Sequence, residues 1–374
     1  MIPTIIETSA HVAVKFKLKI PSDIPTKSKE IFIAGNFNGW ATSDKNYQFK
    51  KERNGTYALK LNLEKGIYEY KIVRGSWTNC EVSKTGESID NRVLNIHEDT
   101  SVNIAVENWA DNFKQTTKKS TAASNVHFLN TAFFIPQLNR YRRIWIYLPQ
   151  DYFSNNRKYP VIYMQDGQNI FDEATSFSGE WAVDEYLNSL PPEKQCIVVA
   201  IDNGDNFRMR EYNPYTNKRF GKEEGNAYAD FLSNTLKPFV DKHYRTLTQA
   251  KYSVIAGSSM GGLISFYTEL KYPHIFGIGG IFSPSFWIAP KLNSDVKKLS
   301  ENFNNNGFYF YGGGQEPDSM ESNIETMQQQ LQNYSTVKTC ISIDNTGIHN
   351  EVYWRNEFPN FYKWCLNFWS HDVY

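Results

Sequence analysis

The chain has 374 residues, which at typical domain sizes predicts two domains or one large one. Lysine plus arginine and aspartate plus glutamate each number 40, so no net charge favours a nucleic acid or an anionic membrane as partner. No apolar run is long enough to span a bilayer, and the first ten residues lack the basic and apolar regions of a signal peptide. As written, the sequence predicts a cytoplasmic protein, although a trimmed precursor of an exported protein would look the same.

Short stretches in the first third of the chain alternate apolar and polar residues. Residues 12–20 (VAVKFKLKI), 56–63 and 68–72 each place successive side chains on opposite faces, which predicts half-buried strands. Turn residues, such as the GNFNG of residues 35–39, separate these stretches. The pattern predicts a small all-β, immunoglobulin-like sandwich over residues 1–108.

A polar, aperiodic segment follows, and after it the pattern changes. Residues 111–125 (DNFKQTTKKSTAASN) are small and polar, so we assign a linker to residues 109–126. Short apolar runs then alternate with helical segments, as at 252–256 and 263–271. This alternation predicts an α/β domain over residues 127–374, with a mainly parallel sheet covered on both faces.

One of these strand-to-helix junctions carries the pattern Gly-x-Ser-x-Gly, formed by Gly257, Ser259 and Gly261. The glycines are needed because a Cβ there would clash with the neighbouring strand or helix, and the sharp turn lifts the serine Oγ out of the sheet. The N–H groups and positive dipole end of the following helix point at the same spot. The pattern alone is weak, and a buried serine in a glycine-rich turn is the alternative. Its position predicts that Ser259 is the nucleophile of a serine hydrolase.

A serine nucleophile needs a general base and an acid that orients it. His349 lies in a loop after the predicted strand 340–343, which gives the expected chain order of nucleophile, acid, histidine. The loop after the preceding strand, residues 312–318, offers two carboxylates, Glu316 and Asp318. Glu316 directly follows the glycine turn and is the first choice, with Asp318 as the second.

The oxyanion of an acyl-transfer reaction needs two backbone N–H donors. The first is predicted at Met260, the residue after the nucleophile. The second is expected in the loop after the strand 161–164, at Gly167, Gln168 or Asn169.

Several aromatic and charged residues lie on loops expected to converge at the carboxyl edge of the sheet. They would suit a sugar or an aryl acid as a substrate-lining rim: Trp181, Arg210, Tyr212 and Trp287. Plain packing is the alternative for Trp181, and a structural ion pair with Glu211 is the alternative for Arg210.

Five segments together resemble the putative-esterase (esterase D-like) family of α/β hydrolases. That family includes the feruloyl and acetylxylan esterases of carbohydrate esterase family 1 and the enterochelin-type siderophore esterases. The matching segments are residues 163–171 (YMQDGQNIF), 181–184 (WAVD), 210–214 (REYNP), 257–262 (GSSMGG) and 347–351 (GIHNE). The resemblance implies an α/β-hydrolase fold over nearly the whole second half, and it favours Glu316 as the acid.

The first half resembles a starch-binding sandwich of the kind found in carbohydrate-binding module families 20 and 48. The matching segments are residues 33–40 (IAGNFNGW), 66–71 (GIYEYK), 75–77 (GSW) and 91–92 (NR). The resemblance implies a glycan site in which Trp40 and Trp77 stack on glucose rings while Lys71 and Asn91 bind hydroxyls. The alternative is a purely structural N-terminal domain, as similar sandwiches form in siderophore esterases.

Together these features predict a two-domain serine carboxylesterase that forms an acyl-enzyme and prefers an acylated carbohydrate. The alternatives are a siderophore (enterochelin-like) esterase and a glycan-binding protein with a degenerate hydrolase half. We expect no metal or organic cofactor, because the sequence has no CxxC pair and no HExxH. We expect no nucleic-acid or membrane partner.

Overall fold

The computed structural model describes residues 11–370 except 29, 39, 88, 90, 114–117, 217–221, 300–302, 304, 318 and 335. The chain divides into two compact units, Met1–Thr117 and Lys118–Tyr374, each with its own core. The division falls inside the predicted linker of 109–126. No helix in the described part of the chain is long and apolar enough to cross a membrane.

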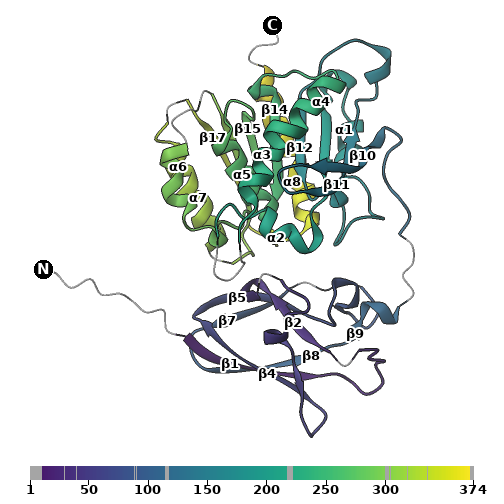
Figure 1. Cartoon of the computed structure of the whole chain (residues 1–374), viewed down its shortest axis with the longest axis vertical. Coiled ribbons are helices and arrows are strands. Elements are labelled where there is room, and N and C mark those ends of the chain that lie inside the picture. The colour runs from purple at the N-terminus through teal and green to yellow at the C-terminus, as the bar shows by residue number, and fades with distance from the viewer. Residues whose placement is uncertain are drawn as a thin grey trace, which may run out of the picture. The chain divides into compact units, whose positions relative to one another are not determined.

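The first unit is a small β domain built from a four-stranded sheet, in the order β3-β4-β1-β8, and a three-stranded sheet, β2-β5-β7 (Figure 1). In β1 the apolar residues of the alternating pattern are buried and the lysines between them are exposed. Phe16 of β1 meets Tyr70 of β5 edge to face, with ring centroids 5.7 Å apart, so the core lies between the two sheets. The strands are β1 (His11–Lys19), β2 (Phe32–Gly35), β3 (Lys50–Lys51), β4 (Tyr57–Glu64), β5 (Gly66–Val73), β6 (Glu81–Val82), β7 (Arg92–Ile96), β8 (Thr100–Ala105) and β9 (Asn108–Trp109).

The second unit contains an eight-stranded sheet in the order β10-β11-β13-β12-β14-β15-β16-β17 (Figure 1). The pairs β10–β11 and β11–β13 are antiparallel and the remaining pairs are parallel. The strands are β10 (Val126–Ile135), β11 (Arg140–Tyr147), β12 (Val161–Gln165), β13 (Ile197–Ile201), β14 (Ser253–Ser258), β15 (Ile278–Phe282), β16 (Gly307–Gly313) and β17 (Lys338–Asp344).

Helices cover both faces of this sheet. Along β12, Val161 and Tyr163 belong to one buried cluster with residues of α3, α5, α6 and α7, while Ile162 and Met164 belong to another with residues of α1 and α8. The helices are α1 (Val183–Asn188), α2 (Arg208–Glu211), α3 (Gly225–Phe231), α4 (Lys237–His243), α5 (Met260–Lys271), α6 (Leu292–Leu299), α7 (Ser319–Leu331) and α8 (Glu351–Ser370), with a π-helical turn at Leu232–Leu236. A mostly parallel sheet covered on both faces, after a small β domain, confirms the predicted fold class.

The chain just after the division, residues 118–125, is hydrogen-bonded to acidic side chains of the second unit. The Thr121 N–H donates to Asp172 Oδ1 at 3.1 Å, and the Ala123 N–H donates to Asp184 Oδ2 at 2.7 Å. These bonds make the segment part of the second unit rather than a free connection.

The carboxyl group of Asp184 gives this attachment a predicted pH dependence. Burial, together with a hydrogen bond to Glu185, raises the pKa of Asp184 to about 8. Between about pH 4 and pH 8 the unfolded chain releases a proton that the folded chain keeps, so the wild-type free energy of unfolding falls as pH rises. Asp184→Asn keeps an oxygen acceptor for Ala123 and does not ionise. We therefore expect the variant to gain stability relative to the wild type from pH 5 to pH 8, by up to about 1.4 kcal/mol per pH unit.

Urea unfolding of both proteins at pH 5, 6, 7 and 8 measures this difference. A stability difference that stays constant across the series would contradict the assignment of the shifted group to Asp184.

Candidate functional site

The turn between β14 and α5 has the backbone that the glycine pattern predicts. Ser259 has φ 58° and ψ −122°, a conformation that non-glycine residues rarely adopt. A Cβ on Gly257 would lie 2.8 Å from backbone atoms of Gly261, and one on Gly262 would lie 2.9 Å from the carbonyl oxygen of Phe282. Strand and helix therefore pack too closely for any side chain at these glycines, and Ser259 is held at the tip of the turn.

His349 and Glu316 come together from the loops after β17 and β16. His349 Nδ1 lies 2.6 Å from Glu316 Oε2, and Oε1 accepts hydrogen bonds from Ser283 Oγ at 2.6 Å and the Gly313 N–H at 2.8 Å. Burial by itself would raise the pKa of Glu316, but the charge of His349 and these hydrogen bonds lower it below its ordinary value. Glu316 is therefore a carboxylate with both oxygens bonded. Asp318, the second choice for the acid, lies outside the described residues.

The loop after β15 connects Ser259 to the bonded pair of Glu316 and His349. Ser285 Oγ lies 3.3 Å from Ser259 Oγ, and the Ser285 N–H donates to the Ser259 carbonyl oxygen at 3.1 Å. Two residues earlier, Ser283 donates to Glu316. The loop after β15, at the carboxyl edge of the sheet, therefore contacts both Ser259 and Glu316.

Trp354 of α8 contacts both Ser283 and His349. Its Nε1–H donates to Ser283 Oγ at 2.9 Å, and its ring meets the His349 ring edge to face, with centroids 5.1 Å apart. Sequence reasoning missed Ser283, Ser285 and Trp354. The position of Ser283 and Ser285 directly after a buried strand was the available signal.

The loop after β12 contains the predicted oxyanion donors. Asp166 has a left-handed backbone with φ 56°, and a short helical turn, Gly167–Asn169, follows it. The Asn169 N–H donates to the Asp166 carbonyl oxygen at 2.9 Å, so it is used within the turn. A Cβ on Gly167 would lie 2.8 Å from backbone atoms at the end of β13, so the turn packs closely against that strand. Gly167 and Gln168 are left as candidates for the second donor beside Met260.

Two of the four predicted substrate-lining residues are buried in this structure, which corrects their assignment to a rim. Trp181 is 3% exposed and packs against Phe282 with ring centroids 4.9 Å apart, because it fills the core under α8. Tyr212 is fully buried, and its hydroxyl oxygen accepts a hydrogen bond from the Asp166 N–H. Trp287, by contrast, is 40% exposed and lies two residues after Ser285.

The alternative considered for Arg210, a structural ion pair with Glu211, is wrong. Arg210 bonds to Glu224 at 2.8 Å, while the buried Glu211 accepts hydrogen bonds from Arg140 and Arg142. Neighbours on one helical turn point in different directions, so each side chain found a partner elsewhere in the chain.

The residues of the predicted glycan site lie in one part of the first unit. The Trp40 and Trp77 rings are 6.0 Å apart at 45°, and Asn91 Nδ2 donates to Glu69 Oε2 at 3.0 Å. Lys71 lies on the same face of β5 as Glu69 and is only 7% exposed. The Lys71 side chain is therefore less accessible than a residue that binds glycan hydroxyls would be.

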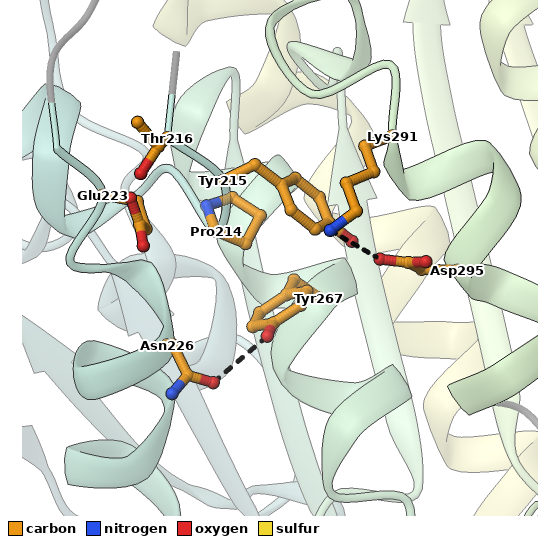
Figure 2. Close-up of a pocket in the computed structure, with 8 residues that line it drawn as sticks. All are labelled: Pro214, Tyr215, Thr216, Glu223, Asn226, Tyr267, Lys291 and Asp295. Carbon is orange, nitrogen blue, oxygen red and sulfur yellow. Dashed lines mark hydrogen bonds and ion pairs between the residues drawn. The ribbon is translucent and has the colours of Figure 1, made fainter.

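The second unit also has an open cavity of about 520 Å³ among α3, α5 and α6 (Figure 2). Figure 2 shows Tyr215 and Tyr267 between Asn226 on one side and the Lys291–Asp295 pair on the other. Within the described structure its lining contains none of the residues predicted for catalysis or substrate contact. It is distinct from the centre around Ser259.

Comparison with known proteins relates both units to others. The model of a family described as "Putative esterase" matches residues 135–364. Protein YbbA of Bacillus subtilis (strain 168) is 24% identical over 237 residues, 60% of this chain and 92% of that protein. The N-terminal region matches part of an alpha-amylase of Niallia circulans, with 32% identity over 101 residues, 26% of this chain and 8% of that enzyme.

A solved structure matches almost the whole chain. The enterobactin esterase FES from Shigella flexneri, crystallised in the presence of enterobactin, superimposes with a TM-score of 0.53 and 15% identity. The match covers 91% of this chain and 88% of that one. A ferulic acid esterase matches with a TM-score of 0.51 and 17% identity over 65% of this chain and 99% of its own. Together with the family match, the enterobactin esterase supports the fold of the whole chain, an α/β hydrolase preceded by a β domain, and the ferulic acid esterase matches only part of it.

Proposed function

Because this chain belongs to the putative-esterase family of α/β hydrolases, we propose that it is a serine carboxylesterase that acts through Ser259, His349 and Glu316. The observation that carries this proposal is the 2.6 Å contact between His349 and the buried Glu316, together with the strained turn of Ser259. A histidine bonded to a buried carboxylate is oriented to act as a general base, and the strained turn presents a hydroxyl.

In the proposed reaction, His349 takes the proton of the Ser259 hydroxyl as Oγ attacks the ester carbonyl carbon. The N–H of Met260 and that of Gly167 or Gln168 stabilise the resulting oxyanion. The tetrahedral intermediate then collapses, and the alcohol leaves with the proton from His349, so an acyl group remains on Ser259. Water, deprotonated by His349, releases the acid and regenerates the enzyme.

We propose an acylated carbohydrate as the substrate class. The match of the N-terminal region to part of an alpha-amylase supports a glycan ligand for the first unit, as does the pair of partly exposed indoles, Trp40 and Trp77. In the second unit, Trp287 offers an exposed ring two residues from Ser285, where the apolar face of a sugar or an aryl acid would pack.

A second candidate is a siderophore trilactone, because the match to the enterobactin esterase covers 91% of this chain and so includes both units. Measuring kcat/KM on acetylated and feruloylated oligosaccharides and on a ferric catecholate trilactone distinguishes the two candidate substrate classes. A higher kcat/KM on the acylated sugars supports the proposal, and a preference for the trilactone would replace it with the second candidate.

Glycan binding by the first unit gives a further prediction. Truncating either indole, by Trp40→Ala or Trp77→Ala, removes aromatic surface worth about 0.5–1.5 kcal/mol, which is a loss of affinity of roughly two- to tenfold. Affinity electrophoresis in gels that contain starch or glycogen measures the loss as faster migration. Phe153→Ala, which truncates an exposed ring of the second unit, is the matched control. Wild-type migration that starch leaves unchanged would assign the sandwich a structural role.

A further inference from the structure

We infer that Arg208 is a positioning residue of the oxyanion hole. It holds the Asp166 carboxylate in place and compensates its negative charge. The inference rests on the proposed function, because it assigns a role within the same esterase centre.

The Asp166 carboxylate lies between the two predicted halves of the oxyanion hole. Asp166 directly precedes Gly167 and Gln168, the candidates for one donor. Its Oδ2 lies 3.0 Å from the place that a Cβ on Gly261 would occupy, and Gly261 directly follows Met260, the other donor. A shift of this carboxylate would therefore move the loop of one donor relative to the helix that carries the other.

Arg208 binds this carboxylate in a two-pronged arrangement. Arg208 Nε donates to Asp166 Oδ1 at 2.7 Å, and Nη2 donates to Oδ2 at 2.9 Å. Asn203 Nδ2 adds a third bond to Oδ1 at 2.8 Å, and Tyr212 accepts from the Asp166 N–H. The planar guanidinium fixes both oxygens at once, which a lysine cannot do. These contacts hold Asp166 in its left-handed conformation.

The helical turn that carries Arg208 is itself anchored. Glu211, in the same short helix, is fully buried and accepts bonds from Arg142 at 2.8 and 2.9 Å and from Arg140 at 2.9 Å. The Arg208 guanidinium also lies 5.2 Å from the centroid of the buried Tyr212 ring. These contacts hold the helix in place, and with it the Arg208 side chain that binds Asp166.

The charge of this pair bears on catalysis as well as its geometry. Burial lowers the pKa of Arg208, but the charge and hydrogen bonds of Asp166, with the nearby Tyr212 and Glu351, together raise it above its ordinary value, so Arg208 stays a charged guanidinium. Burial raises the pKa of Glu351, the charge of Asp166 raises it further and the charge of Arg208 lowers it, so Arg208 offsets the carboxylate at this position. Without Arg208, the Asp166 carboxylate would stand uncompensated beside an atom that becomes negative in the transition state, and it would oppose that charge.

A double-mutant cycle tests the inference. Arg208→Gln is expected to lower kcat on p-nitrophenyl acetate by about ten- to a hundredfold, with KM changed by less than about threefold, because the effect arises in the transition state. Adding Asp166→Asn removes the uncompensated charge, so the double variant should recover at least about fivefold of the lost kcat. Arg208→Lys keeps the positive charge but not the two-pronged contact, so its kcat should lie between those of the wild type and Arg208→Gln.

The matched control is Arg157→Gln, which removes another arginine paired with an aspartate, at the start of β12 rather than at its end. It should keep kcat near the wild-type value. Thermal unfolding of each variant shows whether the fold is retained. If Arg208→Gln keeps the wild-type kcat, or if the double variant is no better than the single one, the inference is overturned. A wild-type protein that neither hydrolyses esters nor reacts with a fluorophosphonate at Ser259 would overturn the proposed function instead.

Discussion

Ser259→Ala is expected to lower kcat for p-nitrophenyl acetate by about 10⁴-fold or more, since no other group forms the acyl-enzyme. The residual rate would come from the oxyanion donors and substrate binding alone, which in serine hydrolases leave some catalysis after the nucleophile is removed. Little change in KM is expected, because the serine hydroxyl contributes to bond formation rather than to ground-state binding. Steady-state kinetics on purified wild type and variant give both constants.

A labelling experiment and a matched variant make this test specific. A fluorophosphonate should add one phosphonyl group to the wild type, located by peptide mass spectrometry at Ser259, and none to Ser259→Ala. Ser265→Ala makes the same substitution in the buried part of α5 and should keep kcat within about threefold of the wild type. Labelling of another serine, or a Ser259→Ala variant with wild-type kcat, would show that the nucleophile lies elsewhere.

The features that the sequence predicted well depend on local constraints. Gly257 and Gly262, on either side of Ser259, are required because a Cβ there would meet backbone atoms at 2.8–2.9 Å, and such a requirement is visible in any sequence that satisfies it. The loops of His349 and Glu316 follow from strand order, because the carboxyl ends of parallel strands meet at one edge. Alternation in residues 12–20 likewise identified β1 and its buried face.

The features that it did not predict depend on partners distant in the chain. Arg208 and Asp166 are separated by 42 residues, and nothing in either segment shows that they pair. The sequence offers Glu211, its neighbour, as an alternative partner for Arg210, which bonds to Glu224 instead. Trp181 occupies a loop, where a tryptophan is often exposed, yet α8 covers it. The sequence shows which side chains can form ion pairs or pack in a core, but not which residues the fold brings next to them.

The segment at 118–125 illustrates the same limit. Its small polar residues are typical of a free linker, but the backbone N–H groups of Thr121 and Ala123 bond to acidic residues more than fifty positions later. Only the fold brings those acids beside it. The attachment of residues 118–125 to the second unit is therefore not visible in the sequence.

His349→Ala is expected to reduce kcat nearly as much as the loss of the nucleophile, because Ser259 would then have no base to take its proton. Glu316→Gln is expected to cost less, on the order of 10²- to 10⁴-fold in kcat, because the histidine stays but is no longer held by a negative charge. Asp318→Asn tests the second choice for the acid and should leave kcat close to the wild-type value. An Asp318→Asn variant that loses more activity than Glu316→Gln would assign the acid to Asp318.

The stability of Glu316→Gln provides an independent check on the same carboxylate. The folded-state pKa of Glu316 is lowered, so its charge contributes stability above the unfolded-state pKa of about 4.3, and that contribution disappears as pH falls through the folded value. Relative to the wild type, the variant should therefore be less stable at pH 7 and approach the wild type as the solution becomes more acidic than about pH 4. This trend is opposite in direction to the one expected for Asp184→Asn, where a raised pKa makes the neutral form the stabilising one. The pair of titrations thus distinguishes a carboxylate that binds a histidine from a carboxyl group that is merely buried.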